Sequence, residues 1–132
     1  MRKRLLSLLL LSICGSMLFA QEPLDIDDVE QVPLGDFTYQ WRNIYDRTPL
    51  HGKCRIILSY RSYTIAHFNK DGILDGLYEK YEDNHLVQKL TYVKGILRGK
   101  GYEYYTDGTV KKECVWNEQG KIDGLMIEYN RI

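Results

Sequence analysis

A repeat of 24 residues is the feature that most constrains what this chain can fold into. Two series of large apolar residues keep this spacing at every step: Ile44, Phe68, Tyr92 and Trp116, and then Ile57, Tyr81, Tyr105 and Tyr129. Self-similarity at a fixed period indicates that one supersecondary unit is stacked repeatedly. The repeat therefore predicts a tandem array and not a single irregular core.

Each unit has the same internal order. A glycine opens a run such as "LYEKY", a polar corner follows, a second run closes on an aromatic residue, and a glycine-containing connector leads onward. Tyr, Val, Thr and Trp favour strands, whereas Gly and Asp favour turns. Asp107-Gly108 is a strong hairpin signal, and Asn84-His85 a weaker one. We interpret the connector glycines and the closing aromatic residues as structural. The glycines are Gly52, Gly72, Gly76, Gly95, Gly99, Gly120 and Gly124, and the aromatic residues are Phe68, Tyr92 and Trp116.

The pattern predicts an all-β chain, because residues 21–132 show no sustained helical spacing of apolar residues. Each unit supplies one β-hairpin. The expected strands are 37–45, 53–60, 62–69, 76–82, 86–93, 100–106, 110–117 and 124–131.

These glycine-spaced, tyrosine-rich units resemble MORN repeats of the bacterial variant type. The likeness covers about residues 44–132 and is clear at "DGILDGLYEKY", "KGILRGKGYEYY" and "QGKIDGLMIEY". It is weaker at "RTPLHGKCRII", where Thr48 and Ile57 replace Gly and Tyr. The resemblance implies an elongated, single-layer antiparallel meander of about four hairpin repeats. It also implies an interaction or tethering module without catalytic residues.

The first 20 residues have the plan of a secretory signal peptide. A basic start at Arg2, Lys3 and Arg4 precedes the apolar run "LLSLLLLSI", and Ala20 precedes a polar region. This run is shorter than the roughly 20 apolar residues of a spanning helix. Lipoprotein processing at Cys14 is disfavoured because Ile13 precedes it, where a small residue is typical. We expect an exported protein, periplasmic or secreted, in which residues 21–36 form an acidic, extended or poorly ordered lead-in to a repeat domain of residues 37–132.

Charge argues against nucleic-acid and membrane partners. Removal of the signal peptide lowers the 18 basic residues to 15 against 18 acidic ones, a net charge of −3. Such a chain offers no basic footprint for nucleic acid or anionic lipid.

Metal, cofactor and catalytic motifs are absent from the sequence. The three histidines, His51, His67 and His85, have no second ligand at metal spacing. The candidate nucleophiles Cys54, Ser59 and Ser62 stand in no recognised motif. Glu79 and Glu103 follow the repeat, which indicates a structural ladder. We expect no enzyme, no metal and no cofactor.

The cysteines give a test of the meander. After signal cleavage Cys54 and Cys114 remain, in the first strand of the first unit and the second strand of the third. Five strand spacings of about 4.8 Å separate them by roughly 24 Å, whereas a disulfide needs Cα atoms within about 7 Å. Two free thiols are expected.

Tyrosine is the candidate binding residue. Strand alternation predicts Ile57, Tyr81, Tyr105 and Tyr129 on one face and Cys54, Tyr78, Tyr102 and Met126 on the other. These ladders could hold the sheet together by cross-strand stacking, or one could stay open to a partner. The candidate contact residues are Tyr78, Tyr81, Tyr102, Tyr104, Tyr105 and Tyr129.

Two functions follow as hypotheses. The first is binding of another envelope or secreted protein through a tyrosine-rich sheet face. The second is self-assembly, because "LMIEYNRI" is expected to be an edge strand with apolar residues and one positive charge, at Arg131.

Overall fold

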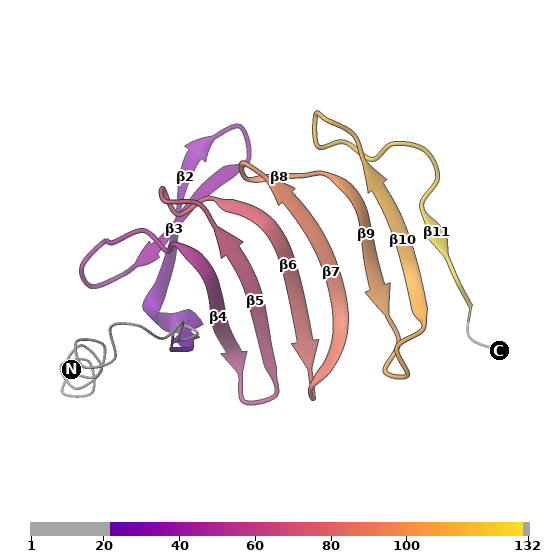
Figure 1. Cartoon of the computed structure of the whole chain (residues 1–132), viewed down its shortest axis with the longest axis horizontal. Coiled ribbons are helices and arrows are strands. Elements are labelled where there is room, and N and C mark those ends of the chain that lie inside the picture. The colour runs from indigo at the N-terminus through magenta and orange to yellow at the C-terminus, as the bar shows by residue number, and fades with distance from the viewer. Residues whose placement is uncertain (1–21, 131–132) are drawn as a thin grey trace, which may run out of the picture.

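The computed structural model of the protein describes residues 22–130 and shows an all-β fold with one short 3-10 helix, η1 (Ile26–Asp28) (Figure 1). Its strands are β1 (Leu24–Asp25), β2 (Val29–Gly35), β3 (Thr38–Asn43), β4 (Gly52–Ser59), β5 (Ser62–Phe68), β6 (Leu74–Glu82), β7 (His85–Val93), β8 (Ile96–Leu97), β9 (Gly99–Tyr104), β10 (Val110–Trp116) and β11 (Ile127–Glu128). The expected signal peptide, residues 1–20, lies outside the described residues.

The main sheet is an antiparallel meander, as the repeat predicts. Its strand order is β1-β4-β5-β6-β7-β9-β10-β11, with β8 paired to β7. From β4 onward each strand lies beside its predecessor in sequence, except that β9 pairs with β7 and not with β8. β1 adds a short parallel strand along β4. The last strand is much shorter than expected, because only two residues of the 124–131 segment are in β11.

Tight turns with left-handed backbone close two hairpins of the main sheet. Residues with positive φ occupy both central positions at Asp83-Asn84 and Lys94-Gly95, which is the geometry that matches strand twist in a two-residue turn. The first of these turns lies one residue earlier than the predicted Asn84-His85, because Glu82 pairs with His85. The guanidinium of Arg61, in the neighbouring turn, holds the Asp83 carboxylate through both oxygens.

The β9–β10 connection is longer than the two-residue turn that Asp107-Gly108 predicts. Tyr104 pairs with Val110, so five residues lie between them. Thr109 N–H donates to the carboxylate of Asp107 over 3.0 Å, and Gly108 has φ +86°. A left-handed glycine after an Asp-headed turn is common in longer hairpin loops.

The prediction of a single layer is wrong over the first half of the sheet. Residues 29–35 and 38–43, which the sequence indicates as lead-in and first repeat strand, pair with each other as a separate sheet, β2–β3. This hairpin lies across one face of the main sheet near β4, β5 and β6 (Figure 1). The segment 21–36 is therefore largely part of the fold and not an irregular lead-in.

The hydrophobic core lies between the two sheets. The main sheet contributes Cys54, Ile56, Ala66, Phe68 and Leu74, with Leu50 from the preceding loop. Trp41 from β3 contacts Phe68, with ring centroids 5.5 Å apart. An apolar face of this size is unfavourable in water, so the hairpin covers it. We call this the covered face of the main sheet, and its opposite the open face.

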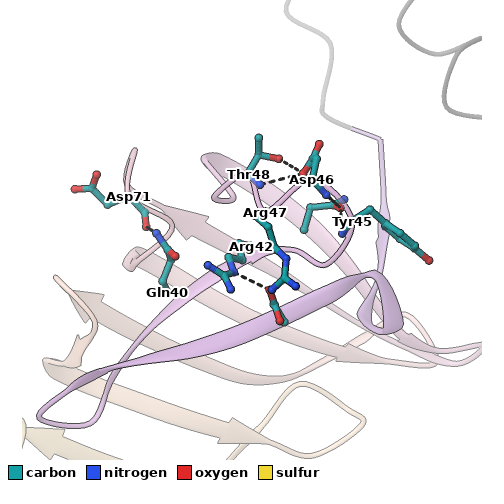
Figure 2. A network of polar contacts seen from close by, with 9 residues as sticks. Gln40, Arg42, Tyr45, Asp46, Arg47, Thr48 and Asp71 are labelled. Atoms are coloured by element: carbon teal, nitrogen blue, oxygen red, sulfur yellow. Dashed lines mark hydrogen bonds and ion pairs between the residues drawn. The ribbon is translucent and has the colours of Figure 1, made fainter.

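Polar contacts hold the hairpin together and join it to the main sheet. Arg42 and Arg47 each donate to Oε1 of Glu30 over 2.7 Å, and the hydrogen bond from Arg42 is the first cause of a lowered pKa at Glu30. The Gln40 side-chain amide donates to the backbone carbonyl of Asp71, 3.0 Å away. Figure 2 shows Gln40 pointing to Asp71 and the two arginines converging below the loop that carries Asp46 and Thr48.

The paired connector glycines have two different roles. The first glycine of each connector is crowded: a β-carbon at Gly72 would collide with the carbonyl oxygen of Trp41, and one at Gly120 with Cγ2 of Ile96. At Gly95 the nearest atom would be Cγ2 of Ile73, at 3.0 Å. Thus the isoleucine after one connector glycine packs against the glycine of the next connector.

The second glycine of two connectors serves the backbone alone. Gly99 and Gly124 have φ +67° and +84°, and a β-carbon on either would meet nothing within 4 Å. Left-handed backbone is unfavourable for residues with a side chain and readily adopted by glycine. These glycines are kept by conformation and not by packing.

Cys54 and Cys114 are both buried, and no disulfide joins them. Cys54 lies in β4 and Cys114 in β10, five strands apart in the sheet order. The prediction that the two thiols do not form a bridge is confirmed.

Candidate binding face

The open face carries a row of residues that crosses the whole main sheet. Pairing registers place these residues opposite one another in turn: Arg55, Ile65, Glu79, Lys89, Tyr102, Glu113 and Ile127. Opposed residues on neighbouring strands contact through their side chains. The row alternates in sign from Arg55 through Glu79 and Lys89 to Glu113, with a tyrosine between the last two.

A stack of planar groups lies beside the N-terminal part of this row. Tyr63 and Tyr81 are directly opposed on β5 and β6, and their rings are stacked with centroids 5.0 Å apart and planes 11° apart. The guanidinium carbon of Arg55 lies 4.0 Å from the centre of the Tyr63 ring. The Tyr81 hydroxyl donates to Oε2 of Glu79 over 3.3 Å. The result is an ordered Arg–Tyr–Tyr stack tied to a carboxylate.

A second pair of rings lies further along the same face. Tyr102 and Tyr104 of β9 point to the same side by strand alternation, and their ring centroids are 6.0 Å apart. Burial is the first cause that raises the pKa of Tyr104, followed by the nearby Tyr102 and Glu79. Pairing registers set Lys89 opposite both Glu79 and Tyr102, so the two pairs of rings belong to one surface.

The predicted division of tyrosines between the faces is wrong at β9. Tyr78 is opposite Leu90, and the same register carried across β7–β9 places Gly101, not Tyr102, on the face of Tyr78. The connector before β9 is one residue shorter than the one before β6, so the offset between these strands is 23 and not 24 residues. Tyr104, and not Tyr105, is therefore the counterpart of Tyr81.

Tyr78 belongs to the covered face. Its ring meets Tyr92 edge-on at 6.0 Å, and it packs against the core cluster. Burial raises the pKa of both hydroxyls. The closing aromatics Phe68 and Trp116 are on this face too, and a β-carbon at Gly101 would collide with the Trp116 ring. Phe68, Tyr92 and Trp116, which the repeat indicates as structural, share this packing layer with Tyr78, which the sequence indicates as a contact residue.

Tyr105 and Tyr129 lie at the C-terminal end of the sheet. The Tyr105 hydroxyl donates to the backbone carbonyl of Tyr129 over 2.8 Å, and Lys111 Nζ lies 5.9 Å from the Tyr105 ring centre. Tyr129 N–H donates to the carbonyl of Lys111. Tyr105 thus anchors the end of the β11 segment and is not part of the stacked pairs.

Sequence reasoning missed Tyr63 and Arg55. Tyr63 has no counterpart in the tyrosine series that define the repeat, and Arg55 has none at all. The predicted strands 62–69 and 76–82, paired end to end, set Tyr63 opposite Glu82, whereas the observed register, which shifts between Ala66 and Phe68, sets it opposite Tyr81. The 24-residue repeat relates residues along the sequence, whereas this stack joins residues across a hairpin.

Alkaline pH should destabilise the fold through its tyrosines. The pKa values of Tyr78, Tyr81, Tyr92 and Tyr104 are raised, with burial the first cause at each. Tyrosines of the unfolded chain ionise at about pH 10. The stability that the folded state gains by keeping these tyrosines neutral is therefore complete below about pH 10. It is lost as the pH rises through the folded-state pKa values. Urea unfolding at increasing pH measures the loss of stability, and tyrosinate absorbance of the native protein measures the folded-state pKa values.

A matched pair of variants isolates this effect. Tyr92→Phe removes one buried hydroxyl and should flatten the alkaline decline, whereas Tyr60→Phe, at a side chain 93% exposed, should leave it unchanged. Equal slopes for both variants and the parent would contradict the assignment to buried tyrosines.

The other candidate groups do not assemble into a site. Cys54 is buried, and its thiol pKa is raised by that burial, so the thiol stays protonated at neutral pH. His51, His67 and His85 are on three separate segments, the β3–β4 loop, β5 and β7. Between residues 22 and 130 no group of three His, Cys, Asp or Glu side chains is placed to hold a metal ion.

Comparison with known proteins gives little. No protein-family model and no curated protein matches the chain. Among solved structures, the crystal structure of TarM matches with a TM-score of 0.40 and 14% identity over 72% of this chain and 18% of that one. A mutant of S. aureus TarM in complex with Fondaparinux, alpha-GlcNAc-glycerol and UDP matches with a TM-score of 0.29 and 13% identity, covering 72% and 16%. The chain spans less than a fifth of either protein.

Proposed function

We propose that this chain is a non-enzymatic binding module of the MORN-like kind, exported from the cytoplasm, that recognises another envelope or secreted protein through its open face. The observation that carries the proposal is the Arg55–Tyr63–Tyr81 stack. These planar groups are held in one arrangement on the side of the sheet away from the core cluster.

Tyrosine and arginine suit such a surface. Tyrosine offers a large contact area with few rotatable bonds, and both residues are enriched where binding energy concentrates. Here the rings are ordered before a partner arrives, so binding immobilises few side chains. The alternation of Arg55, Glu79, Lys89 and Glu113 supplies a charge pattern that a protein partner can complement.

Site-specific photocrosslinking in the native cell tests this proposal. A photoreactive amino acid at position 102, on the open face, should capture one defined partner. The same group at position 60, in the exposed β4–β5 turn, is the matched control and should not. Tyr81→Ala should weaken the partner's binding by about tenfold or more, while circular dichroism shows that the sheet remains. Equal capture from both positions, or from neither, would overturn the proposal.

Export is tested separately on the recovered protein. Cleavage after Ala20 gives a chain that begins at Gln21, and the intact mass of the purified protein reports this directly. Across residues 22–130 no helix is long and apolar enough to span a membrane. A mass that includes residues 1–20 would contradict signal cleavage.

Self-association through the β11 edge is a second candidate function, favoured by exposed apolar residues there. Leu125, Met126 and Ile127 are all exposed, Leu125 to 86%, and β11 pairs with β10 over only two residues. An edge strand with apolar side chains is a template for pairing with another chain.

Leu125→Lys tests the edge without disturbing the fold, because this side chain is already in solvent. Sedimentation velocity over a range of concentrations should show association of the parent protein and a monomer for Leu125→Lys. Leu34→Lys, at another exposed leucine in the β2–β3 hairpin, is the control and should associate like the parent. A parent protein that stays monomeric at every concentration would exclude this candidate.

A further inference from the structure

A depression on the covered side of the molecule is separate from the open face. It has a volume of about 420 Å³ and lies where the β2–β3 hairpin reaches past the core. Phe37, Tyr39 and Trp41 line it from the hairpin, and Tyr92, Ile96 and Leu97 line it from the main sheet. This volume is within the range of small-ligand sites, which are typically apolar with a few polar groups.

The two-residue turn at the tip of the hairpin places a bulky aromatic residue where the turn requires positive φ. Asp36 and Phe37 form its two-residue turn with φ +46° and +65°. Asparagine, aspartate and glycine accept such backbone, whereas a bulky aromatic is a genuine outlier. Phe37 is nevertheless 95% exposed, so it contributes no burial in return. A strained residue that does not stabilise the fold indicates a contact with something else.

The charge of the lining selects the kind of ligand. Among the described residues that line the depression, Asp36 is the only one with a side chain ionised at neutral pH. Phosphates and carboxylates are therefore disfavoured. The faces of aromatic rings attract cations, and cages of such rings recognise quaternary ammonium groups. A nearby carboxylate adds to this attraction.

We propose that this depression binds a quaternary ammonium group, such as that of choline, among the rings of Phe37, Tyr39 and Trp41 and beside the Asp36 carboxylate. Phe37 is held in its unfavourable backbone conformation to complete the cage. The ligand is a small cation and not a phosphate ester, because a phosphate would face Asp36. This site is independent of the proposed partner surface, which uses the other face of the sheet.

Equilibrium binding of choline to residues 21–132, followed by tryptophan fluorescence because Trp41 lines the site, tests the proposal. The decisive control is the uncharged isostere of choline in which carbon replaces the quaternary nitrogen. Choline should bind at least about tenfold more tightly than the isostere, and phosphocholine more weakly than choline. Equal affinity for choline and its isostere would show a merely apolar depression and overturn the proposal. Absence of choline binding at tens of millimolar would do the same.

Variants at the hairpin tip separate the site from the fold. Asp36→Asn keeps the shape and tolerates the backbone, so it should weaken choline binding several-fold at unchanged Tm. Phe37→Gly removes a ring and relieves the strain, so it should weaken binding while raising Tm by a few degrees. Tyr60→Ala, at an equally exposed turn aromatic, should change neither. A Phe37→Gly variant with full affinity, or with a lowered Tm, would contradict the role given to Phe37.

Discussion

Replacement of Phe68 by alanine should lower the free energy of unfolding by about 3 to 5 kcal/mol, the usual loss for a fully buried aromatic ring. Phe68 is only 4% exposed and joins the two sheets through its contact with Trp41. Domains of this size are stable by about 5 to 15 kcal/mol, so the variant should unfold at a low urea concentration. Urea unfolding followed by circular dichroism measures the change.

The same deletion at an exposed phenylalanine gives the control. Phe37→Ala removes an identical ring from the hairpin tip, where it is in solvent, and should shift stability by about 0.5 kcal/mol or less. A Phe68→Ala loss below about 1.5 kcal/mol would mean that the hairpin does not pack on the sheet as described. In that case the losses of stability in Trp41→Ala and Phe68→Ala would add up in the double variant. Contact between the two rings predicts instead that the losses are not additive.

Gly72→Ala should be the most damaging of the glycine replacements. Gly72 has φ +76°, which costs a residue with a β-carbon about 1 to 2 kcal/mol. The added methyl would also collide with the backbone oxygen of Trp41, which cannot move aside like the end of a side chain. Overpacking of this kind adds about 1 to 3 kcal/mol. The variant should also loosen the hairpin, seen as faster hydrogen exchange at Trp41, whose N–H donates to the Gly72 carbonyl.

Gly108→Ala separates conformation from collision. Gly108 has a similar φ of +86°, but a β-carbon there would meet nothing within 4 Å. Only the conformational cost should appear, about 1 to 2 kcal/mol. Equal losses at Gly72 and Gly108 would show that the connector does not press against β3.

Local pattern was enough to find the repeat strands. Residues 53–60, 62–69 and 86–93 are predicted within one residue of β4, β5 and β7, because strand-forming runs there alternate with glycine and polar turns. The final strand fails for a physical reason. In the expected strand 124–131, only Ile127 and Glu128 pair with β10, so only these two residues form β11.

The distribution of side chains between faces was less predictable, because alternation magnifies a shift of one residue. A single missing residue before Gly95 moves Tyr102 to the side opposite Tyr78. The shortening is visible in the sequence, but its effect on the faces emerges only when pairing registers are followed from strand to strand. Tyr63 and Arg55 enter the site through the same cross-strand pairing.

The covering hairpin could not be deduced from its own residues. Pro33 and the acidic cluster before it argue against a strand, yet residues 29–35 form β2. The reason is tertiary: the face of β4 and β5 that carries Ile56 and Phe68 requires a cover, and Trp41 and Val29 provide it. Pro33 is tolerated because β2 is an edge strand of its two-stranded sheet.

The stacking of connectors has a consequence for how this protein can change its length. Two connectors carry a glycine that packs against an isoleucine from the connector before it: Gly95 against Ile73, and Gly120 against Ile96. A duplicated unit would therefore bring both halves of the contact with it. Gain or loss of a whole unit preserves these glycine–isoleucine contacts, whereas an insertion of any other length separates the isoleucine from its glycine. The sheet can thus be resized in steps of whole units, and its open face lengthened, by duplication alone.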